Sequence, residues 1–246
     1  HSMALKKDGK VWIWGYNDEA QLGLGPESYS SVYTPTLVPN LTDVIAISAF
    51  GDFCMVLRND GTIWTWGSNG NYQLGDGSTN RRSGYPVKVI GLSNVTAIAA
   101  GDRFCLALES DGTVWAWGYN AYGTLGRGNF DQFNPENGPL QVLNLSNIVQ
   151  ISASRHCLAL KDDGSVWAWG DNGFGQLGLG YDGLNVNAPV MLTTISEIGF
   201  VAAGMGVSYA VAGNGRTWSW GDNTNKKLFD NSEGFRNTPQ VLDSLF

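Results

Sequence analysis

The tetrapeptide Trp-x-Trp-Gly occurs five times in this 246-residue chain and constrains its fold more than any other feature. All ten tryptophans belong to these five motifs, whose successive spacings are 52, 51, 52 and 51 residues. The second tryptophans are Trp14, Trp66, Trp117, Trp169 and Trp220. A fixed period of this length indicates a chain built from repeated supersecondary units. We place these units at about residues 1–43, 44–94, 95–147, 148–197 and 198–246.

Other residues recur in step with the tryptophans. An Asp-Gly or Asn-Gly dipeptide precedes each motif and fits a hairpin turn that needs positive φ. An asparagine follows three residues after each second tryptophan, and we interpret it as a turn residue that hydrogen-bonds the backbone of the following loop. The asparagines are Asn17, Asn69, Asn120, Asn172 and Asn223. A leucine follows eight residues after the tryptophan, and a proline comes later in every unit.

Each unit contains four short apolar stretches that are separated by turn residues, which predicts four strands. In the third unit we expect these strands at residues 95–100, 104–108, 113–117 and 139–142. Because proline is tolerated only at a sheet edge, the fourth strand should be outermost. Trp115 and Trp117 are two residues apart and should project from one face of the third strand.

A four-stranded sheet repeated about every 50 residues is typical of a β-propeller. The predicted fold class is therefore all-β, a β-propeller of five repeats of about 51 residues with four-stranded antiparallel blades. We expect one propeller domain over residues 1–246, which is either a whole ring or a fragment of a longer propeller.

Residues 159–178, in the fourth unit, resemble the repeat of the regulator of chromosome condensation family. The resemblance covers almost the whole chain and implies a propeller in which one face binds another protein. Better-known members have seven units, whereas this chain has five, and we expect a bacterial member. Light-sensing members carry additional tryptophans at the start of the second strand, where this chain has Phe53, Phe104, His156 and Val207. Light sensing is therefore not expected.

The two ends of the chain leave ring closure open. Residues 1–5 align with the second strand of the other units, and residues 239–241 align with the fourth, so a first strand is missing from the opening unit. The alternatives are a three-stranded first blade, a fragment of a longer propeller, or pairing supplied by a second chain. Since unpaired strand edges invite association, self-association through such an edge is an expected partner contact.

Charge and hydropathy limit the remaining partners. The net charge of −7 disfavours nucleic acid, because a phosphate backbone repels an acidic surface. The chain has no apolar run of roughly 18 residues, so we expect no membrane insertion. Few lysines and many Asn, Gly, Ser and Thr residues favour a secreted or bacterial cell-surface location over the cytoplasm.

Residues that could carry chemistry occupy repeated packing positions. His1 and His156 share one position with phenylalanine and valine, which favours a packing role over catalysis. Cys54, Cys105 and Cys157 share the next position with serine and should be small buried residues. We therefore expect no enzyme, no catalytic residue, no metal site and no cofactor.

Variation between the units points instead to a binding face. The loops between the first and second strands and between the third and fourth strands vary, and alternating strand direction places both kinds of loop at one end of each sheet. Such loops on a rigid scaffold are where binding concentrates, and Tyr, Phe, Met and Arg anchor protein interfaces. The candidate partner-binding residues are Asp52, Phe53, Asp102, Arg103, Arg155, Met205, Tyr29, Tyr33, Arg81, Arg82, Arg127, Phe130, Phe133, Tyr181, Phe235 and Arg236. We predict a non-enzymatic protein-binding scaffold, with a glycan-binding propeller on a bacterial surface as the alternative.

Overall fold

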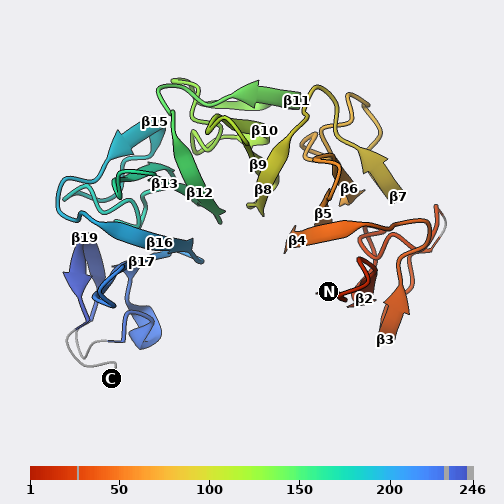
Figure 1. Cartoon of the computed structure of the whole chain (residues 1–246), viewed down its shortest axis with the longest axis horizontal. Helices are drawn as coiled ribbons and strands as arrows, with labels where there is room; N and C mark the ends of the chain where they lie inside the picture. Colours follow the sequence, from red (N-terminus) through yellow and green to blue (C-terminus); the bar gives the residue numbers. More distant parts are fainter. Residues whose placement is uncertain (27, 230–232, 243–246) are drawn as a thin grey trace. The chain divides into compact units, whose positions relative to one another are not determined.

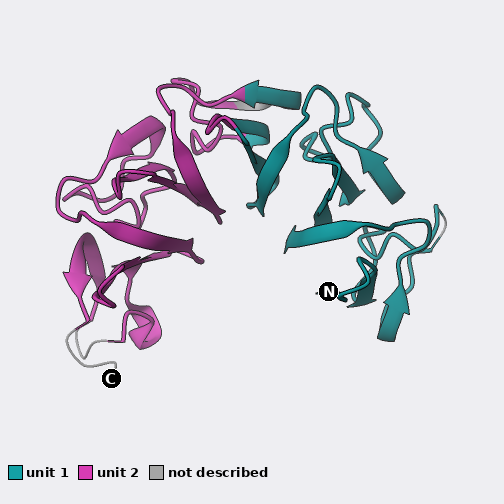
Figure 2. Ribbon diagram, viewed as in Figure 1, with its two compact units in different colours: residues 1–110, 115–119, 132–140 teal, residues 111–114, 120–131, 141–246 magenta. Residues whose placement is uncertain are grey.

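The computed structural model describes residues 1–26, 28–229 and 233–242, with only the backbone of residues 132–135. It consists of two compact units (Figure 2). Unit 1 comprises His1–Ser110, Trp115–Tyr119 and Gln132–Leu140, and unit 2 comprises Asp111–Val114, Asn120–Asp131 and Gln141–Phe246. We describe each unit by itself.

Unit 1 contains the first two sheets (Figure 1). The first has three strands in the order β1-β2-β3, and the second has four in the order β4-β5-β6-β7. The strands of the first sheet are β1 (Ser2–Leu5), β2 (Val11–Gly15) and β3 (Val32–Leu37). Those of the second are β4 (Val44–Phe50), β5 (Phe53–Arg58), β6 (Ile63–Ser68) and β7 (Arg82–Lys88).

The third sheet has the order β11-β10-β9-β8 and draws residues from both units. Its strands are β8 (Val95–Ala100), β9 (Phe104–Glu109), β10 (Val114–Asn120) and β11 (Asp131–Gln141). The first three match the strands predicted for this unit to within a few residues. The fourth was predicted too short, because proline at position 139 lies inside an edge strand that already begins at Asp131.

Unit 2 contains the fourth and fifth sheets, in the orders β12-β13-β14-β15 and β16-β17-β18-β19. The fourth sheet is formed by β12 (Ile148–Ala153), β13 (His156–Lys161), β14 (Val166–Gly170) and β15 (Val186–Met191). The fifth is formed by β16 (Ile198–Ala203), β17 (Val207–Ala212), β18 (Thr217–Asp222) and β19 (Phe235–Val241). A 3-10 turn, η1 (Thr224–Lys226), lies between β18 and β19.

The five sheets have antiparallel pairing wherever the register is described, and four of them have the four strands that the sequence predicts. The first sheet has three strands among the described residues, which departs from the four-stranded pattern of the repeat and matches one of the alternatives predicted for the first blade. The proline-bearing last strand of each sheet, which is β3 in the first sheet, lies at a sheet edge, as predicted.

Successive sheets are joined by the second tryptophan of the repeat. Its indole N–H donates to a backbone carbonyl of the preceding sheet, from Trp66 to Gln21 at 2.9 Å and from Trp117 to Gln73 at 3.0 Å in unit 1. In unit 2, Trp169 donates to Thr124 and Trp220 to Gln176, both at 2.8 Å. These four indoles are fully buried, so each joint combines a large apolar contact with a satisfied polar atom.

The loop that supplies this carbonyl is held by the recurring asparagine. The side-chain oxygen of Asn69 accepts from the backbone N–H of Leu74 at 3.0 Å, and its amide donates to the carbonyl of Asn80 at 2.7 Å. Asn172 makes the same two contacts in unit 2, with Leu177 and Tyr181. The predicted role of these asparagines as loop-binding residues is confirmed. The buried leucine behind each loop fixes the carbonyl opposite the next tryptophan.

Candidate protein-binding surface

In each four-stranded sheet the two variable loops meet at one end, as the sequence predicts. The loop after the third strand donates a backbone hydrogen bond to the loop between the first two strands, from Ser68 to Asp52 at 2.9 Å in unit 1. In unit 2, Asp171 donates to Arg155 at 3.1 Å and Asp222 to Gly206 at 2.8 Å. We call this end of each sheet the loop end and the end with the Asp-Gly hairpins the turn end.

A hollow of about 180 Å³ opens at the loop end of unit 2. It lies between the fourth and fifth sheets and is lined by Arg155, Asp171, Phe174, Met205, Gly206, Asp222 and Lys227. Met205 stands at its edge with 71% of its surface exposed. Two of the predicted binding residues, Arg155 and Met205, are therefore brought together here.

Ion pairs fix the charged walls of this hollow. Arg155 lies 3.6 Å from the Asp171 carboxylate, and Lys227 donates to Asp222 at 2.5 Å. Desolvation acts to raise the pKa of Asp222, but hydrogen bonds from Lys227 and Thr224 outweigh it and leave that pKa below its usual value. Asp222 is thus held as a carboxylate, and both acid–base pairs are ordered before any ligand arrives.

Aromatic rings support the same surface. The Arg155 guanidinium lies over the Tyr122 ring, 4.6 Å from its centroid, and also donates to the Tyr122 hydroxyl. Phe174 packs edge-to-face against Phe235 with 5.1 Å between ring centroids, which connects the predicted residue Phe235 to the hollow. Arg155 is therefore a positioned cation rather than a flexible surface side chain.

A smaller hollow of about 130 Å³ lies at the loop end of unit 1. Its lining includes Asp52, Phe53, Asp102 and Arg103, four of the residues that the sequence predicts for partner binding, although the Phe53 side chain is buried. The Gln21 amide donates to Asp52 at 3.1 Å, and Arg103 pairs with Asp102 at 3.7 Å. Phe50 also lines this hollow and is partly buried, but no methionine comparable to Met205 is among its described lining residues.

Tyr29 and Arg82 form a further group in unit 1. The Arg82 guanidinium lies over the Tyr29 ring at 5.3 Å, donates to the carbonyl of Asp18 at 2.8 Å and pairs with Glu19 at 3.5 Å. Arg82 is the first residue of β7, so strand pairing positions it beside the loop of the first sheet. This group presents an exposed tyrosine with a fixed cation beneath it.

The remaining predicted residues divide into three sets. Tyr33, Arg81, Phe130 and Tyr181 are exposed, and Arg127 and Arg236 are partly exposed, but no described contact brings them to either hollow. The side chain of Phe133 lies outside the described residues. Phe53 corrects the prediction, because it begins β5 and packs in the core of unit 1 with only 1% of its surface exposed.

The sequence interpretation missed Tyr122, Phe174, Asp171 and Asp222. All four lie near the start of the loop between the third and fourth strands, beside the recurring asparagine, whereas the residues predicted from this loop lie further along it. The position two residues after that asparagine reads Glu, Asn, Tyr, Phe and Asn in the five units, and the position one residue before it reads Tyr, Ser, Tyr, Asp and Asp. Variation at these two positions beside the constant asparagine was the available signal.

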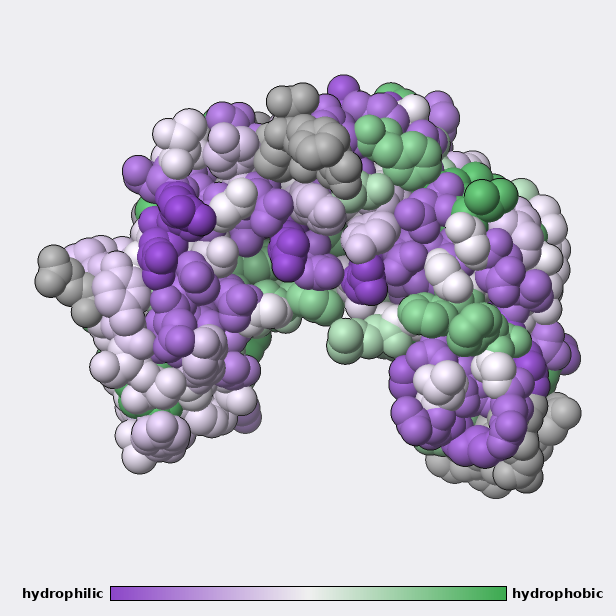
Figure 3. All heavy atoms as spheres, turned by 180° about the vertical axis from the view of Figure 1, so that it is seen from behind, coloured by the Kyte–Doolittle hydropathy of each residue, from purple (hydrophilic) through white to green (hydrophobic). Residues whose placement is uncertain are grey.

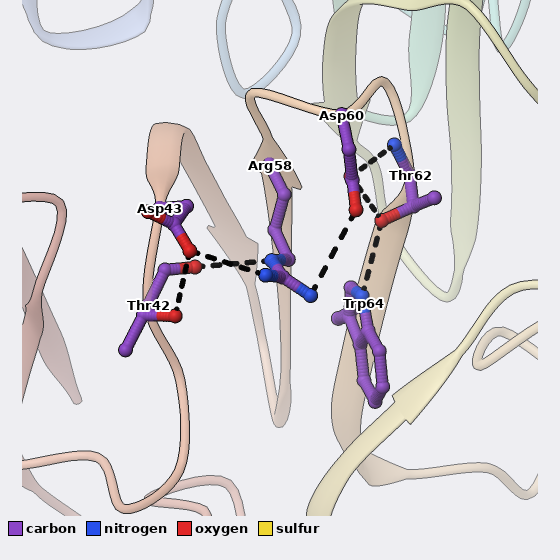
Figure 4. A network of polar contacts seen from close by, with 6 residues as sticks. All are labelled: Thr42, Asp43, Arg58, Asp60, Thr62 and Trp64. Carbon is purple, nitrogen blue, oxygen red and sulfur yellow. Dashed lines mark hydrogen bonds and ion pairs between the residues drawn. The ribbon is translucent and has the colours of Figure 1, made fainter.

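The turn end of unit 1 has a structural network (Figure 4). Arg58 pairs with Asp43 at 3.3 Å and with Asp60 at 3.9 Å, and it also donates to the carbonyl of Thr42. Asp60 accepts from the backbone and hydroxyl of Thr62, which holds the pKa of Asp60 below its usual value. The Asp60 carboxylate thus accepts hydrogen bonds within its own hairpin, as predicted for a turn residue.

A larger hollow of about 390 Å³ lies beside this network, lined by Pro39, Asn40, Leu41, Arg58, Trp64, Tyr85 and Pro86. Its lining is mainly apolar and holds an Arg58 side chain already bound on both sides by carboxylates. None of the residues predicted for partner binding lines it.

His156 and the three cysteines are buried, as expected, whereas His1 is only partly buried. Cys54, Cys105 and Cys157 are inaccessible, and their thiols donate to the same carbonyls that accept the tryptophan N–H groups, at 3.2 to 3.4 Å. Burial raises the pKa of all three thiols well above the usual value. Among the described residues, no group of three or more His, Cys, Asp or Glu side chains could hold a metal ion.

Hydrophilic residues cover most of the face seen in Figure 3, and apolar residues gather in smaller groups. No helix within the described part of the chain is long and apolar enough to span a membrane.

Antiparallel sheets joined by repeated tryptophans, with variable loops at one end, define a blade-repeat protein of the propeller class. The chain belongs to the RCC1-like domain family, whose match extends over residues 1–246. This confirms the family that the repeat sequence indicates.

Individual relatives agree with this assignment. The chain is 31% identical to the ultraviolet-B receptor UVR8 of Arabidopsis thaliana, covering all of this chain and 56% of that protein. It is 30% identical to the human E3 ubiquitin-protein ligase HERC2 over 98% of this chain and 5% of HERC2. Yeast RCC1 (Prp20), solved bound to Kap60, superposes with a TM-score of 0.86 and 26% identity over 99% of this chain and 59% of that one.

The chain thus spans little more than half the length of UVR8 and of the Prp20 chain. These relatives are plant, human and yeast proteins, so they lend no support to the bacterial origin expected from the sequence.

Proposed function

We propose that this chain is a non-enzymatic protein-binding module that engages its partner through the loop end of unit 2. The observation that carries the proposal is Met205, which is 71% exposed at the edge of a hollow whose charged walls are already fixed by ion pairs. An exposed methionine among ordered polar groups is the arrangement of a binding anchor inside a polar rim.

The side chains that line the hollow are already ordered, which favours binding energetically. Arg155 is held between Asp171 and Tyr122, so little side-chain entropy remains to be lost when a partner covers it. Phe174 and Phe235 form a rigid aromatic base beside it. Prp20 is described bound to the protein Kap60, which supports protein recognition as the activity of this kind of fold.

The glycan-binding alternative lacks comparable support. A repeated sugar site should present the same aromatic and polar residues in each unit, but the loop end of unit 1 offers Asp52, Asp102 and Arg103 where unit 2 offers Arg155 and Met205. None of the relatives described above is named as a lectin. The differing surfaces favour a protein site that belongs to unit 2 over a sugar site repeated in every sheet.

Photo-crosslinking in the source cells tests this proposal. A benzophenone amino acid replaces Met205 in one variant and Asp162, which is exposed at the turn end of unit 2, in a matched control. We expect one protein adduct at position 205 that is absent at position 162, and we expect Phe235→Ser to weaken it. Equal adducts at both positions, or none at position 205, would contradict the proposal.

A further inference from the structure

A buried glutamine of the first sheet binds the next sheet in unit 1. The side-chain oxygen of Gln21 accepts from the backbone N–H of Glu19 at 3.0 Å, and its amide nitrogen donates to the Asp52 carboxylate at 3.1 Å. Gln21 is fully buried, so its amide needs an acceptor within the protein. Asp52, in the loop between β4 and β5, supplies that acceptor.

Gln176 has the same position in the repeat of unit 2, but its amide nitrogen has no acceptor. The side chain is fully buried, and its Oε1 accepts from the backbone N–H of Phe174 at 2.8 Å, so the amide is oriented as it is in Gln21. Its Nε2 is buried without a hydrogen-bond partner among the described residues. A buried donor without an acceptor costs free energy in the folded chain, and a ligand that brings an acceptor recovers it.

The residue that faces Gln176 across the joint is a glycine. An added Cβ at Gly67, in unit 1, would lie 2.4 Å from the carbonyl oxygen of Asp52. At the corresponding Gly221 of unit 2 it would lie 2.2 Å from the carbonyl oxygen of Gly206 and 3.2 Å from Cβ of Gln176. The backbone of Gly206 therefore has the place of Asp52, but without a side chain it brings no carboxylate to the joint.

Gly206 belongs to the lining of the hollow at the loop end of unit 2. An added Cβ there would lie 3.1 Å from the Phe174 ring and 3.4 Å from Cβ of Asp222, two residues of the same lining. A methylene group of a bound side chain would thus contact both of them. The exposed Met205 stands beside this point and adds apolar surface for the rest of a ligand.

The charges of the lining suit an anionic acceptor. Arg155 and Lys227 are the two cations of the hollow. Its two acids are each paired with one of them, Asp171 with Arg155 at 3.6 Å and Asp222 with Lys227 at 2.5 Å. A third carboxylate would therefore meet acids whose charge is already balanced, and an ionised acceptor binds an amide donor more strongly than a neutral one does.

We propose that the hollow of unit 2 receives an aspartate or glutamate side chain of the protein partner, whose carboxylate accepts from Nε2 of Gln176 as Asp52 accepts from Gln21. This inference rests on the proposed function, because it names the chemistry by which a partner is recognised at the same surface. The partner completes in unit 2 a contact that unit 1 makes within its own chain.

Gln176→Met tests the contact, because it removes the amide donor with little change in side-chain volume. Gln73→Met is the matched control, since Gln73 is also buried and binds its own loop through the Asn71 N–H at 2.9 Å. We expect the partner adduct formed by the benzophenone at position 205 to fall at least about tenfold in Gln176→Met and to stay unchanged in Gln73→Met. Urea denaturation verifies that both variants fold.

A second measurement uses the unaltered chain and needs no variant. In an NMR titration of the ¹⁵N-labelled protein with acetyl-aspartate amide, we expect the side-chain amide resonance of Gln176 to shift to saturation while that of Gln73 stays fixed. Acetyl-asparagine amide, which lacks the charge, should produce a weaker response.

The outcomes separate this inference from the proposed function. Absence of any adduct at position 205 in the unaltered chain contradicts the proposed function. An adduct that persists in folded Gln176→Met overturns the carboxylate contact alone. So does a titration in which Gln176 fails to respond, responds no more than Gln73, or responds equally to the aspartate and asparagine probes.

Discussion

The indole N–H of Trp117 donates a 3.0 Å hydrogen bond to the backbone carbonyl of Gln73, an atom that also accepts from the Cys105 thiol at 3.3 Å. Replacing Trp117 with phenylalanine leaves this carbonyl without its stronger donor and opens space in the core. We expect the free energy of unfolding to fall by about 2 to 4 kcal/mol, measured by urea denaturation. Trp14→Phe is the control and should cost less than half as much, because Trp14 is only partly buried. An equal loss of unfolding free energy in the two variants would mean that burial and hydrogen bonding of the Trp117 indole add nothing to the effect of the smaller ring.

Gly75→Ala should destabilise the chain more than Gly91→Ala. Both glycines have positive φ, 62° and 73°, so alanine introduces a similar backbone strain of about 1 to 2 kcal/mol at each. The Cβ at position 75 would lie 2.4 Å from the Trp117 indole nitrogen, whereas nothing lies within 4 Å of the Cβ at position 91. The overpacking should add about 1 to 3 kcal/mol at position 75 alone, measured as the difference between the two unfolding free energies.

His156 should make the chain less stable as the pH falls. Burial lowers the pKa of His156 to about 3, whereas the unfolded chain takes up this proton near pH 6.5. The unfolded state therefore binds more protons between these values, so the histidine's contribution to stability is complete above pH 6.5 and is lost towards pH 3. The slope should reach about 1.4 kcal/mol per pH unit.

The hydrogen bonds around His156 explain why protonation of its imidazole is unfavourable in the folded chain. Ser208 donates to the Gln176 carbonyl at 2.7 Å, so its oxygen is left to accept from Nε2 of His156, also at 2.7 Å. The added proton would then sit on Nδ1, a buried atom with no hydrogen-bond partner among the described residues. His156→Phe, which places there the side chain that Phe104 has at the same repeat position, should remove this part of the pH dependence. An unchanged difference between pH 7 and pH 4 would contradict the assignment.

The three thiols should report global unfolding. Cys54, Cys105 and Cys157 are fully buried with raised pKa values, so a disulfide reagent at pH 8 should label none of them in the folded chain. All three should react with a single rate when urea unfolds the protein. Met205→Cys supplies the control, because a thiol at that exposed position should react at once. A native thiol that reacts separately would reveal local opening of its sheet.

The sequence predicted the strands and the loop contacts of the recurring asparagine better than the loop surfaces. Trp-x-Trp-Gly and the following asparagine identify strand positions and loop contacts because each repeat satisfies the same local geometry. Phe53 was wrongly assigned to the binding face although the repeat alignment places it at the start of the second strand, at the position shared with His156 that predicts packing. Tyr122 and Phe174 were missed because their importance comes from packing on Arg155 and Phe235, which are distant in sequence.

Every tryptophan joint spans nearly the same length of chain. The donor follows its acceptor by 44 or 45 residues in all four cases, and the acceptor always belongs to the earlier repeat. During synthesis each carbonyl is therefore made before the indole that binds it, and each new repeat finds its docking surface already present. Contacts of constant and moderate sequence separation allow assembly one repeat at a time from the N-terminal end of each unit, without waiting for distant segments to meet.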